Sequence, residues 1–115
     1  MTVTIYHNPR CSKSRQTLAL IEEQGVTPKI VDYVKTPPSA SELKRVLKKL
    51  GLKPRDILRK GEAIYAELGL DGKDLKDDAL LALMVKNPIL IERPIVVSGD
   101  KAALGRPPEA VLKIL

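Results

Sequence analysis

The sequence predicts an α/β fold in which helices flank a mixed β-sheet, with a helical insert between an N-terminal βαβ unit and a C-terminal ββα unit. Three observations predict this fold. Short β-rich segments at residues 3–6 and 29–34 enclose a helical pattern. Residues 39–87 carry helical patterns and no strand signal. Strand signals return at residues 93–98 and are followed by a Gly–Asp turn.

The N-terminal unit is predicted from the order strand, helix, strand. Residues 3–6 are short, rich in β-forming side chains and end directly before a His–Asn–Pro turn, which predicts a buried strand. From Ser12 the apolar side chains recur with helical spacing, and Gly25 is a plausible end of that helix. Residues 29–34 then predict the second strand. Cys11 therefore stands where the first strand passes into the first helix.

The insert is predicted to hold three or four helices. Ser39 stands three residues before Glu42, the spacing of a capping box, and an apolar stripe runs from there to Gly51. Pro54 begins a further helical turn. Two more helical patterns follow, and the second has acids in its first turn and a lysine near its end, which suits the helix dipole. Their sequences are "EAIYAELGL" and "KDDALLALMVKNP".

The C-terminal unit is predicted as a strand over residues 93–98, a returning strand over 101–105 and a closing helix over 106–115 with proline at its start. The complete order matches a thioredoxin-like core whose last hairpin is antiparallel. We therefore expect one domain over residues 1–115, with the helical insert at about 39–90.

Composition excludes several classes of protein. A single cysteine excludes an internal disulfide, a CxxC metal site and a dithiol pair, and a lone free thiol suits a reducing cytoplasm. No apolar run approaches the ~20 residues of a membrane span, and the N-terminus lacks the pattern of a signal peptide. The net charge is +6, but three tyrosines and no long basic run give little reason to expect a nucleic-acid partner. A basic balance also suits a protein that binds a small oxyanion.

The segment "YHNPRCSKSR" combines the only cysteine with several cations and no acid. A thiolate is the reactive form of cysteine, and a helix N-terminus or nearby cations lower the thiol pKa. Both influences are expected at Cys11, with charge from Arg10, Lys13 and Arg15 and a further contribution from His7. The free N–H groups at the helix start also suit a tetrahedral anion. On residue type alone a lone cysteine is more often an inert, buried side chain, but its position favours a nucleophile.

Other chemistries fit this segment less well. A phosphatase loop requires arginine six residues after the cysteine, where Thr17 stands. A thioredoxin-type dithiol requires a second cysteine in place of Ser14. One cysteine and one histidine are too few for a closed metal site, so we expect no metal.

The sequence resembles the glutaredoxin-dependent arsenate reductases of the ArsC type, over essentially the whole chain. The blocks that carry the resemblance occur in the same order as in that family: "IYHNPRCSKSRQTL", "YVKTPPSASEL", "ILRKGEAIYAELGL", "NPILIERPIVV" and "GRPPEAVL".

The resemblance implies an enzyme that reduces arsenate to arsenite, and a site that binds arsenate or a similar oxyanion. In this family the cysteine attacks arsenic, glutathione attacks next, and glutaredoxin resolves the mixed disulfide, so no tightly bound cofactor is expected. Arginine suits such a substrate because it is always charged and offers paired donors. The resemblance implies catalytic roles for Cys11 and His7, and substrate binding by Arg59, Arg93, Arg106 and Ser14.

Two further expectations follow from the resemblance. Thioredoxin-like folds place a cis-proline before the strand that faces the cysteine, so we expect a cis bond between Arg93 and Pro94. The loop also departs from the family pattern "NPACGTSR" at Arg10, Ser12 and Lys13. These changes add bulk and charge beside the nucleophile, which affects anion binding or the access of glutathione.

Two other functions stay open at this point. One is a different single-cysteine, glutathione-linked thiol reductase that uses the same loop. The other is a regulator of the Spx type, which binds RNA polymerase without catalysis; proteins of that type usually carry a Cys–x–x–Cys switch, and Ser14 replaces its second cysteine here.

Overall fold

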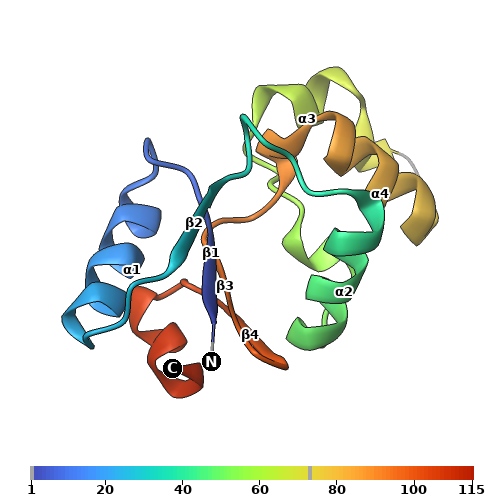
Figure 1. Cartoon of the computed structure of the whole chain (residues 1–115). Coiled ribbons are helices and arrows are strands. Elements are labelled where there is room, and N and C mark those ends of the chain that lie inside the picture. Colours follow the sequence, from blue (N-terminus) through green and yellow to red (C-terminus); the bar gives the residue numbers. More distant parts are fainter. Residues whose placement is uncertain (1, 73) are drawn as a thin grey trace. The chain divides into compact units, whose positions relative to one another are not determined.

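In a computed structural model the chain forms a four-stranded sheet and a separate group of helices (Figure 1). The structure describes residues 2–72 and 74–115. The chain divides into two compact units, one formed by residues 1–36 with 93–115 and one by residues 37–92. The second unit corresponds to the expected insert, and the assignment of both units to one domain stays a prediction.

The sheet of the first unit is mixed, as predicted. Its strands are β1 (Val3–His7), β2 (Lys29–Asp32), β3 (Ile95–Ser98) and β4 (Lys101–Leu104), in the order β2-β1-β3-β4. β1 and β2 are parallel, whereas β3 is antiparallel to both β1 and β4. The antiparallel final hairpin and the thioredoxin-like arrangement are thereby confirmed.

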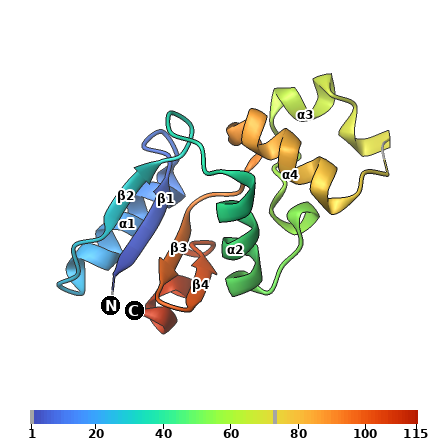
Figure 2. The same ribbon diagram turned by 45° about the vertical axis from the view of Figure 1, so that its right-hand side comes forward.

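Helix α1 (Ser12–Glu23) and the final helical segment η4 (Pro108–Ile114) pack on one face of this sheet (Figure 2). Their contact is an aliphatic core to which helices and strands both contribute. Apolar burial of this kind is the main favourable term in folding. Its fully or nearly fully buried members are Val3, Ile5, Ile21, Val96 and Val111.

Several predicted bounds differ from the structure: β1 extends to His7, β3 begins at Ile95 and β4 ends at Leu104. β2 ends at Asp32 rather than residue 34, because the Asp32 carbonyl accepts hydrogen bonds from the N–H groups of Lys35 and Thr36 and so turns the chain. The closing helix is a 3₁₀ segment rather than an α-helix. It spans seven residues behind Pro107, which is long for this geometry, since 3₁₀ runs beyond ~3–4 residues are uncommon.

The second unit consists of α2 (Ala40–Leu50), α3 (Ala63–Glu67), α4 (Asp77–Lys86) and the short 3₁₀ segments η1 (Pro54–Ile57), η2 (Leu70–Gly72) and η3 (Pro88–Leu90). The predicted cap of α2 is confirmed, since the Ser39 hydroxyl accepts the N–H of Glu42 at 3.1 Å. The helix ends at Gly51 in a left-handed conformation, with φ of 70°.

Two proline bonds in the first unit are cis. The Arg93–Pro94 bond is cis, as expected from the resemblance, and the Arg106–Pro107 bond is cis as well, which the sequence did not predict. Within residues 2–72 and 74–115, none of the helices has the length and apolar character that crossing a membrane would require.

Candidate functional site

The sheet topology gathers three separate segments of the first unit at one end. Tyr6 lies opposite Ile95 in the β1–β3 pair, and Ile95 lies opposite Leu104 in the β3–β4 pair. The loop after β1, the residues before β3 and those after β4 therefore meet at the same edge. These segments carry Cys11, Arg93 and Arg106.

The loop between β1 and α1 is closed by hydrogen bonds within itself. Cys11 is the N-cap residue of α1, as its position in the sequence predicted, and its N–H donates to the Asn8 carbonyl at 3.0 Å. The Asn8 side-chain oxygen accepts the N–H of Arg10 at 3.0 Å. The Asn8 N–H in turn donates to the buried hydroxyl of Ser14 at 3.0 Å. This network fixes the backbone around a half-buried thiol.

The Cys11 thiol is more acidic than an ordinary cysteine. Burial is the largest single influence and acts to raise its pKa, but it is outweighed by the N–H of Ser14, the guanidinium of Arg93 and the N–H of Lys13, so that the pKa is lowered. The N–H groups belong to the first turn of α1, where the backbone has no internal acceptor. The expected thiolate at a helix start is thus supported by the local geometry.

The source of the positive charge differs from the expectation. Among charged groups it is Arg93 that lowers the Cys11 pKa, through a hydrogen bond and through its charge. Arg10, Lys13 and Arg15 were expected to supply this charge, but all three side chains are exposed. A buried cation acts on the sulfur through a medium that screens it less than water does.

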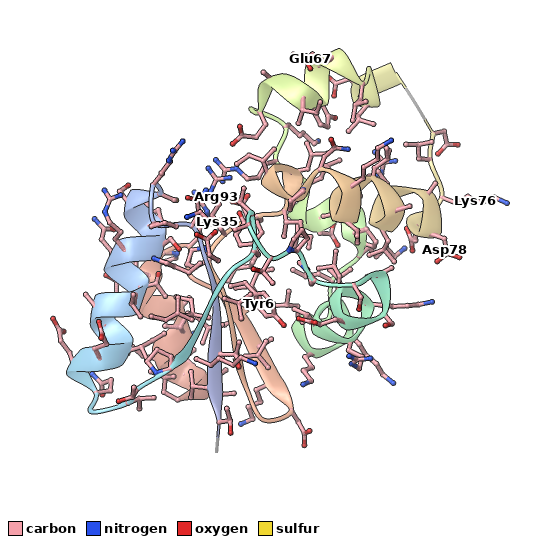
Figure 3. All side chains as sticks on the ribbon, turned by 45° about the horizontal axis from the view of Figure 1, so that its top comes forward. Tyr6, Lys35, Glu67, Lys76, Asp78 and Arg93 are labelled. Carbon is pink, nitrogen blue, oxygen red and sulfur yellow. The ribbon has the colours of Figure 1, made fainter. Side chains whose placement is uncertain are left out.

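Arg93 and Arg106 both reach the Cys11 sulfur. Arg106 donates from Nε to the Arg93 carbonyl at 2.8 Å, and its Nη2 lies 3.7 Å from the Cys11 sulfur. Arg93 is almost completely buried, and Figure 3 labels its position at this end of the sheet. Burial alone would lower the Arg93 pKa, but the neighbouring side chains of Tyr33 and Cys11 outweigh it and raise the pKa. The buried Arg93 guanidinium therefore stays charged beside the sulfur.

His7 contacts Ser14, and its pKa is lower than that of an ordinary histidine. Its Nδ1 lies 2.7 Å from the Ser14 hydroxyl, and both side chains are buried. Burial is the main reason that the His7 pKa is lowered, partly opposed by Asp32 and assisted by Arg15. Burial thus disfavours the positive charge that was expected from His7, because it favours the neutral imidazole.

Ser14 lies at the centre of the loop. Its side chain is fully buried, and its hydroxyl is already engaged by Asn8 and His7. Its backbone N–H, in contrast, faces the Cys11 sulfur and lowers the thiol pKa. Substrate binding by Ser14 stays a prediction, and in this geometry the N–H is the group that could carry it.

Two residues at the site were missed by the sequence reasoning. A Cβ atom on Gly105 would come within 2.6 Å of Pro94 Cγ and would also collide with Thr17, so only glycine allows this close approach. A glycine at the end of a strand can signal such an approach. Tyr33, which contacts Arg93, is fully buried, and in the sequence its position reads simply as part of an apolar strand.

Arg59 belongs to the second unit. Its Nη1 lies 2.6 Å from Glu92 Oε1, and its Nε lies 3.3 Å from Glu62 Oε1. Two carboxylates thus fix the guanidinium within this unit. The substrate-binding role of Arg59 stays a prediction.

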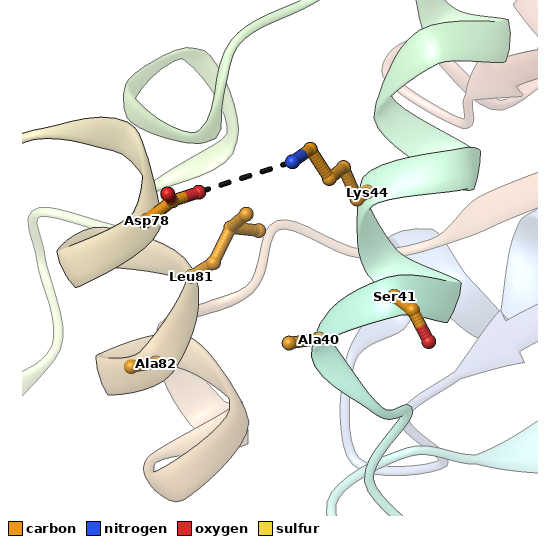
Figure 4. A pocket seen from close by; sticks show the side chains of 6 residues that line it. All are labelled: Ala40, Ser41, Lys44, Asp78, Leu81 and Ala82. Carbon is orange, nitrogen blue, oxygen red and sulfur yellow. Dashed lines mark ion pairs between the residues drawn. The ribbon is translucent and has the colours of Figure 1, made fainter.

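The second unit also has a shallow pocket between α2 and α4, of about 310 Å³ (Figure 4). Its rim carries Lys44 and Asp78, whose charged atoms are 3.9 Å apart and whose side chains are largely exposed. None of the predicted site residues lines it. Its lining residues are Ala40, Ser41, Lys44, Asp78, Leu81 and Ala82.

Fold and site together define a class of protein: a thioredoxin-like oxidoreductase with one acidic thiol and arginines beside it. Comparison with known proteins gives the family. The model of the ArsC family matches residues 6–114, and this chain belongs to that family.

Relatives and solved structures agree with the family assignment. The chain is 53% identical to the uncharacterised protein YfgD of Escherichia coli K12 over 98% of this chain and 96% of that protein. It is 49% identical to an arsenate reductase of Neisseria meningitidis serogroup A, over 98% and 97% of the two chains. A solved structure of an arsenate reductase from Vibrio cholerae superposes with a TM-score of 0.95 at 55% identity, covering 100% of this chain and 98% of that one.

Proposed function

We propose that this protein is an arsenate reductase in which Cys11 is the nucleophile. The observation that carries the proposal is the half-buried Cys11 sulfur, which lies at a helix N-terminus with Arg93 and Arg106 beside it. An arsenate ion bonded to this sulfur would meet guanidinium donors at once. Such donors stabilise the charge that develops on the oxygens during attack.

The reaction transfers two electrons from external thiols to arsenic. The Cys11 thiolate attacks arsenic, an S–As bond forms, and one arsenate oxygen leaves as water after protonation. A glutathione thiolate then attacks the Cys11 sulfur. An S–S bond forms, the S–As bond breaks, and its electron pair stays on arsenic, which leaves as arsenite. A glutaredoxin thiolate finally takes the glutathione sulfur from Cys11 and releases the Cys11 thiolate.

The other residues support this reaction in different ways. Arg93 and Arg106 hold the oxyanion, while His7 and Ser14 keep the loop in shape through their buried hydrogen bond. The Arg59 assignment rests on the resemblance of its sequence block, and the Nη2 atom is not part of either of its ion pairs. No bound cofactor is required, because thiols supply both electrons. A reducing cytoplasm is the compartment in which such a thiol and its partners stay reduced.

The pH dependence of Cys11 alkylation tests the proposal, with and without arsenate. We expect the alkylation rate to rise through a midpoint below the ~8.5 of a free thiol, and arsenate to slow the reaction. Sodium chloride at the same ionic strength is the control for general screening. An ordinary midpoint together with no protection by arsenate would refute the nucleophile assignment.

Arsenate reduction with glutathione and glutaredoxin tests the substrate. Wild-type protein should form arsenite, and Cys11→Ser should form none. If wild-type protein forms no arsenite but its Cys11 still reacts with oxidised glutathione, the protein is a different glutathione-linked reductase. If wild-type protein neither reduces arsenate nor reacts with oxidised glutathione, and it captures RNA polymerase, a regulator is favoured instead.

A further inference from the structure

The cysteine loop carries three exposed cations that have no assigned part in the chemistry of Cys11. Arg10, Lys13 and Arg15 are all exposed, and the segment 6–15 contains no acid. The Arg15 guanidinium donates to the Pro9 carbonyl at 2.8 Å, so Arg15 has a structural contact within the loop. Within residues 2–72 and 74–115, no carboxylate forms an ion pair with Arg10 or Lys13. Two uncompensated cations therefore flank the cysteine.

Arg10 and Lys13 lie next to Cys11 in the chain. Arg10 directly precedes Cys11, and Lys13 lies in the first turn of the helix that Cys11 caps. Arg93 is buried beside the sulfur, whereas Arg10 and Lys13 are exposed. Two exposed cations therefore stand close in sequence to the half-buried sulfur.

The reaction requires a second thiol from outside the chain, because Cys11 is its only cysteine. Glutathione carries two carboxylates and one ammonium group, so its net charge is negative at neutral pH. Arginine can hold a carboxylate through two parallel donors, and lysine adds a point charge. The charges of the loop and of this thiol are thus complementary.

We propose that Arg10 and Lys13 form a docking site for the carboxylates of glutathione and thereby guide its sulfur to Cys11. This inference deepens the function proposed above and rests on it. Arg10 and Lys13 stand where the loop pattern "NPACGTSR" has alanine and threonine. Complementary charges of this kind act chiefly on the rate of encounter.

A thiol–disulfide exchange assay measures docking without arsenate. The Cys11 thiolate attacks oxidised glutathione, a mixed disulfide forms, and one glutathione thiolate leaves. The same rate is measured with 2,2′-dithiodipyridine, which has no carboxylate. The ratio of the two rate constants removes any change in the reactivity of Cys11 itself. This ratio is measurable whether or not the protein reduces arsenate, so a failure of docking and a failure of the proposed function are distinguishable.

The variants are Arg10→Ala, Lys13→Ala and the double variant, with Lys101→Ala as the matched control. Lys101 is an exposed cation of the first unit that lies at the opposite end of the sheet, since it pairs with Ser98, which pairs with Val3. Exposed ion pairs of ~0.2–1 kcal/mol correspond to about a 1.4- to 5-fold fall in the ratio for each cation removed. For the double variant we expect about a 2- to 25-fold fall, if the two effects add.

Salt provides a second measurement on the same variants. Raising the ionic strength should lower the ratio for wild-type protein and for Lys101→Ala, and should change it much less for the double variant. The proposal is overturned if the double variant keeps the wild-type ratio. It is also overturned if Lys101→Ala lowers the ratio as much as Arg10→Ala, because the effect is then one of net charge. If the variants slow only the step in which glutaredoxin takes glutathione from Cys11, the two cations recognise glutaredoxin, and glutathione docking is rejected.

Discussion

The buried hydroxyl of Ser14 links the loop around Cys11 to Asn8 and His7, and Ser14→Ala tests how much this link stabilises the loop. The substitution removes one oxygen atom from a fully buried position. It breaks the 3.0 Å hydrogen bond from the Asn8 N–H and the 2.7 Å hydrogen bond with His7 Nδ1. The backbone N–H of residue 14, which acts on Cys11, is retained. The variant therefore separates the support of the loop from the chemistry of its N–H group.

The size of the effect follows from these two contacts. A lost hydrogen bond that leaves a buried polar partner costs about 1–3 kcal/mol, and here both partners lie in a buried network. Alanine is favoured over serine within a helix by roughly 0.5 kcal/mol, which offsets a little of the loss. We expect the free energy of unfolding to fall by about 2–4 kcal/mol. That is a large part of the stability of a small domain.

Urea denaturation measures this change, with Ser12→Ala as the matched control. Ser12 is an exposed serine in the same turn of α1, so its substitution should change stability by less than about 0.5 kcal/mol. If Ser14→Ala and Ser12→Ala have the same midpoint and slope, the buried network does not stabilise the loop and the reasoning is refuted.

Three further outcomes are expected. Arg93→Gln should move the midpoint of Cys11 alkylation to higher pH, because the charge that lowers the thiol pKa is lost. Gly105→Ala should reduce stability by about 1–3 kcal/mol in urea and weaken protection of Cys11 by arsenate, because the new methyl group displaces the segment that carries Arg106. Ser39→Ala should cost about 1 kcal/mol by the loss of a helix cap, with the alkylation profile of Cys11 unchanged.

Each of these outcomes has a clear contrary result. An unshifted alkylation midpoint in Arg93→Gln would mean that helix N–H groups alone acidify the thiol. Wild-type stability in Gly105→Ala would show that the neighbouring segments yield to a methyl group. A changed alkylation profile in Ser39→Ala would mean that a cap in the second unit affects the thiol.

Local sequence patterns were sufficient for most secondary structure. Three confirmed features depend on residues adjacent in the chain. They are the first strand, the helix that starts after Cys11 and the helix cap at Ser39. Where a prediction was wrong in its bounds, another local contact decided the outcome, as with the Asp32 carbonyl that ends β2. These features follow from short-range propensities and hydrogen bonds.

The chemistry of the site depended on contacts between distant segments. Local sequence correctly placed a lone thiol at a helix N-terminus, where unpaired N–H groups favour a thiolate. It attributed the positive charge to neighbouring cations, but those side chains are exposed, and the folded sheet brings the buried Arg93 to the sulfur instead.

The sequence by itself therefore determined the order of the elements, the fold class and the position of the thiol at a helix start, because each is encoded in neighbouring residues. Tertiary structure alone decided that burial lowers the His7 pKa, that Arg106 reaches the sulfur and that Gly105 admits no side chain. The physical reason is that burial and close approach depend on which segments of the fold surround a group. Spacing along the chain does not contain that information.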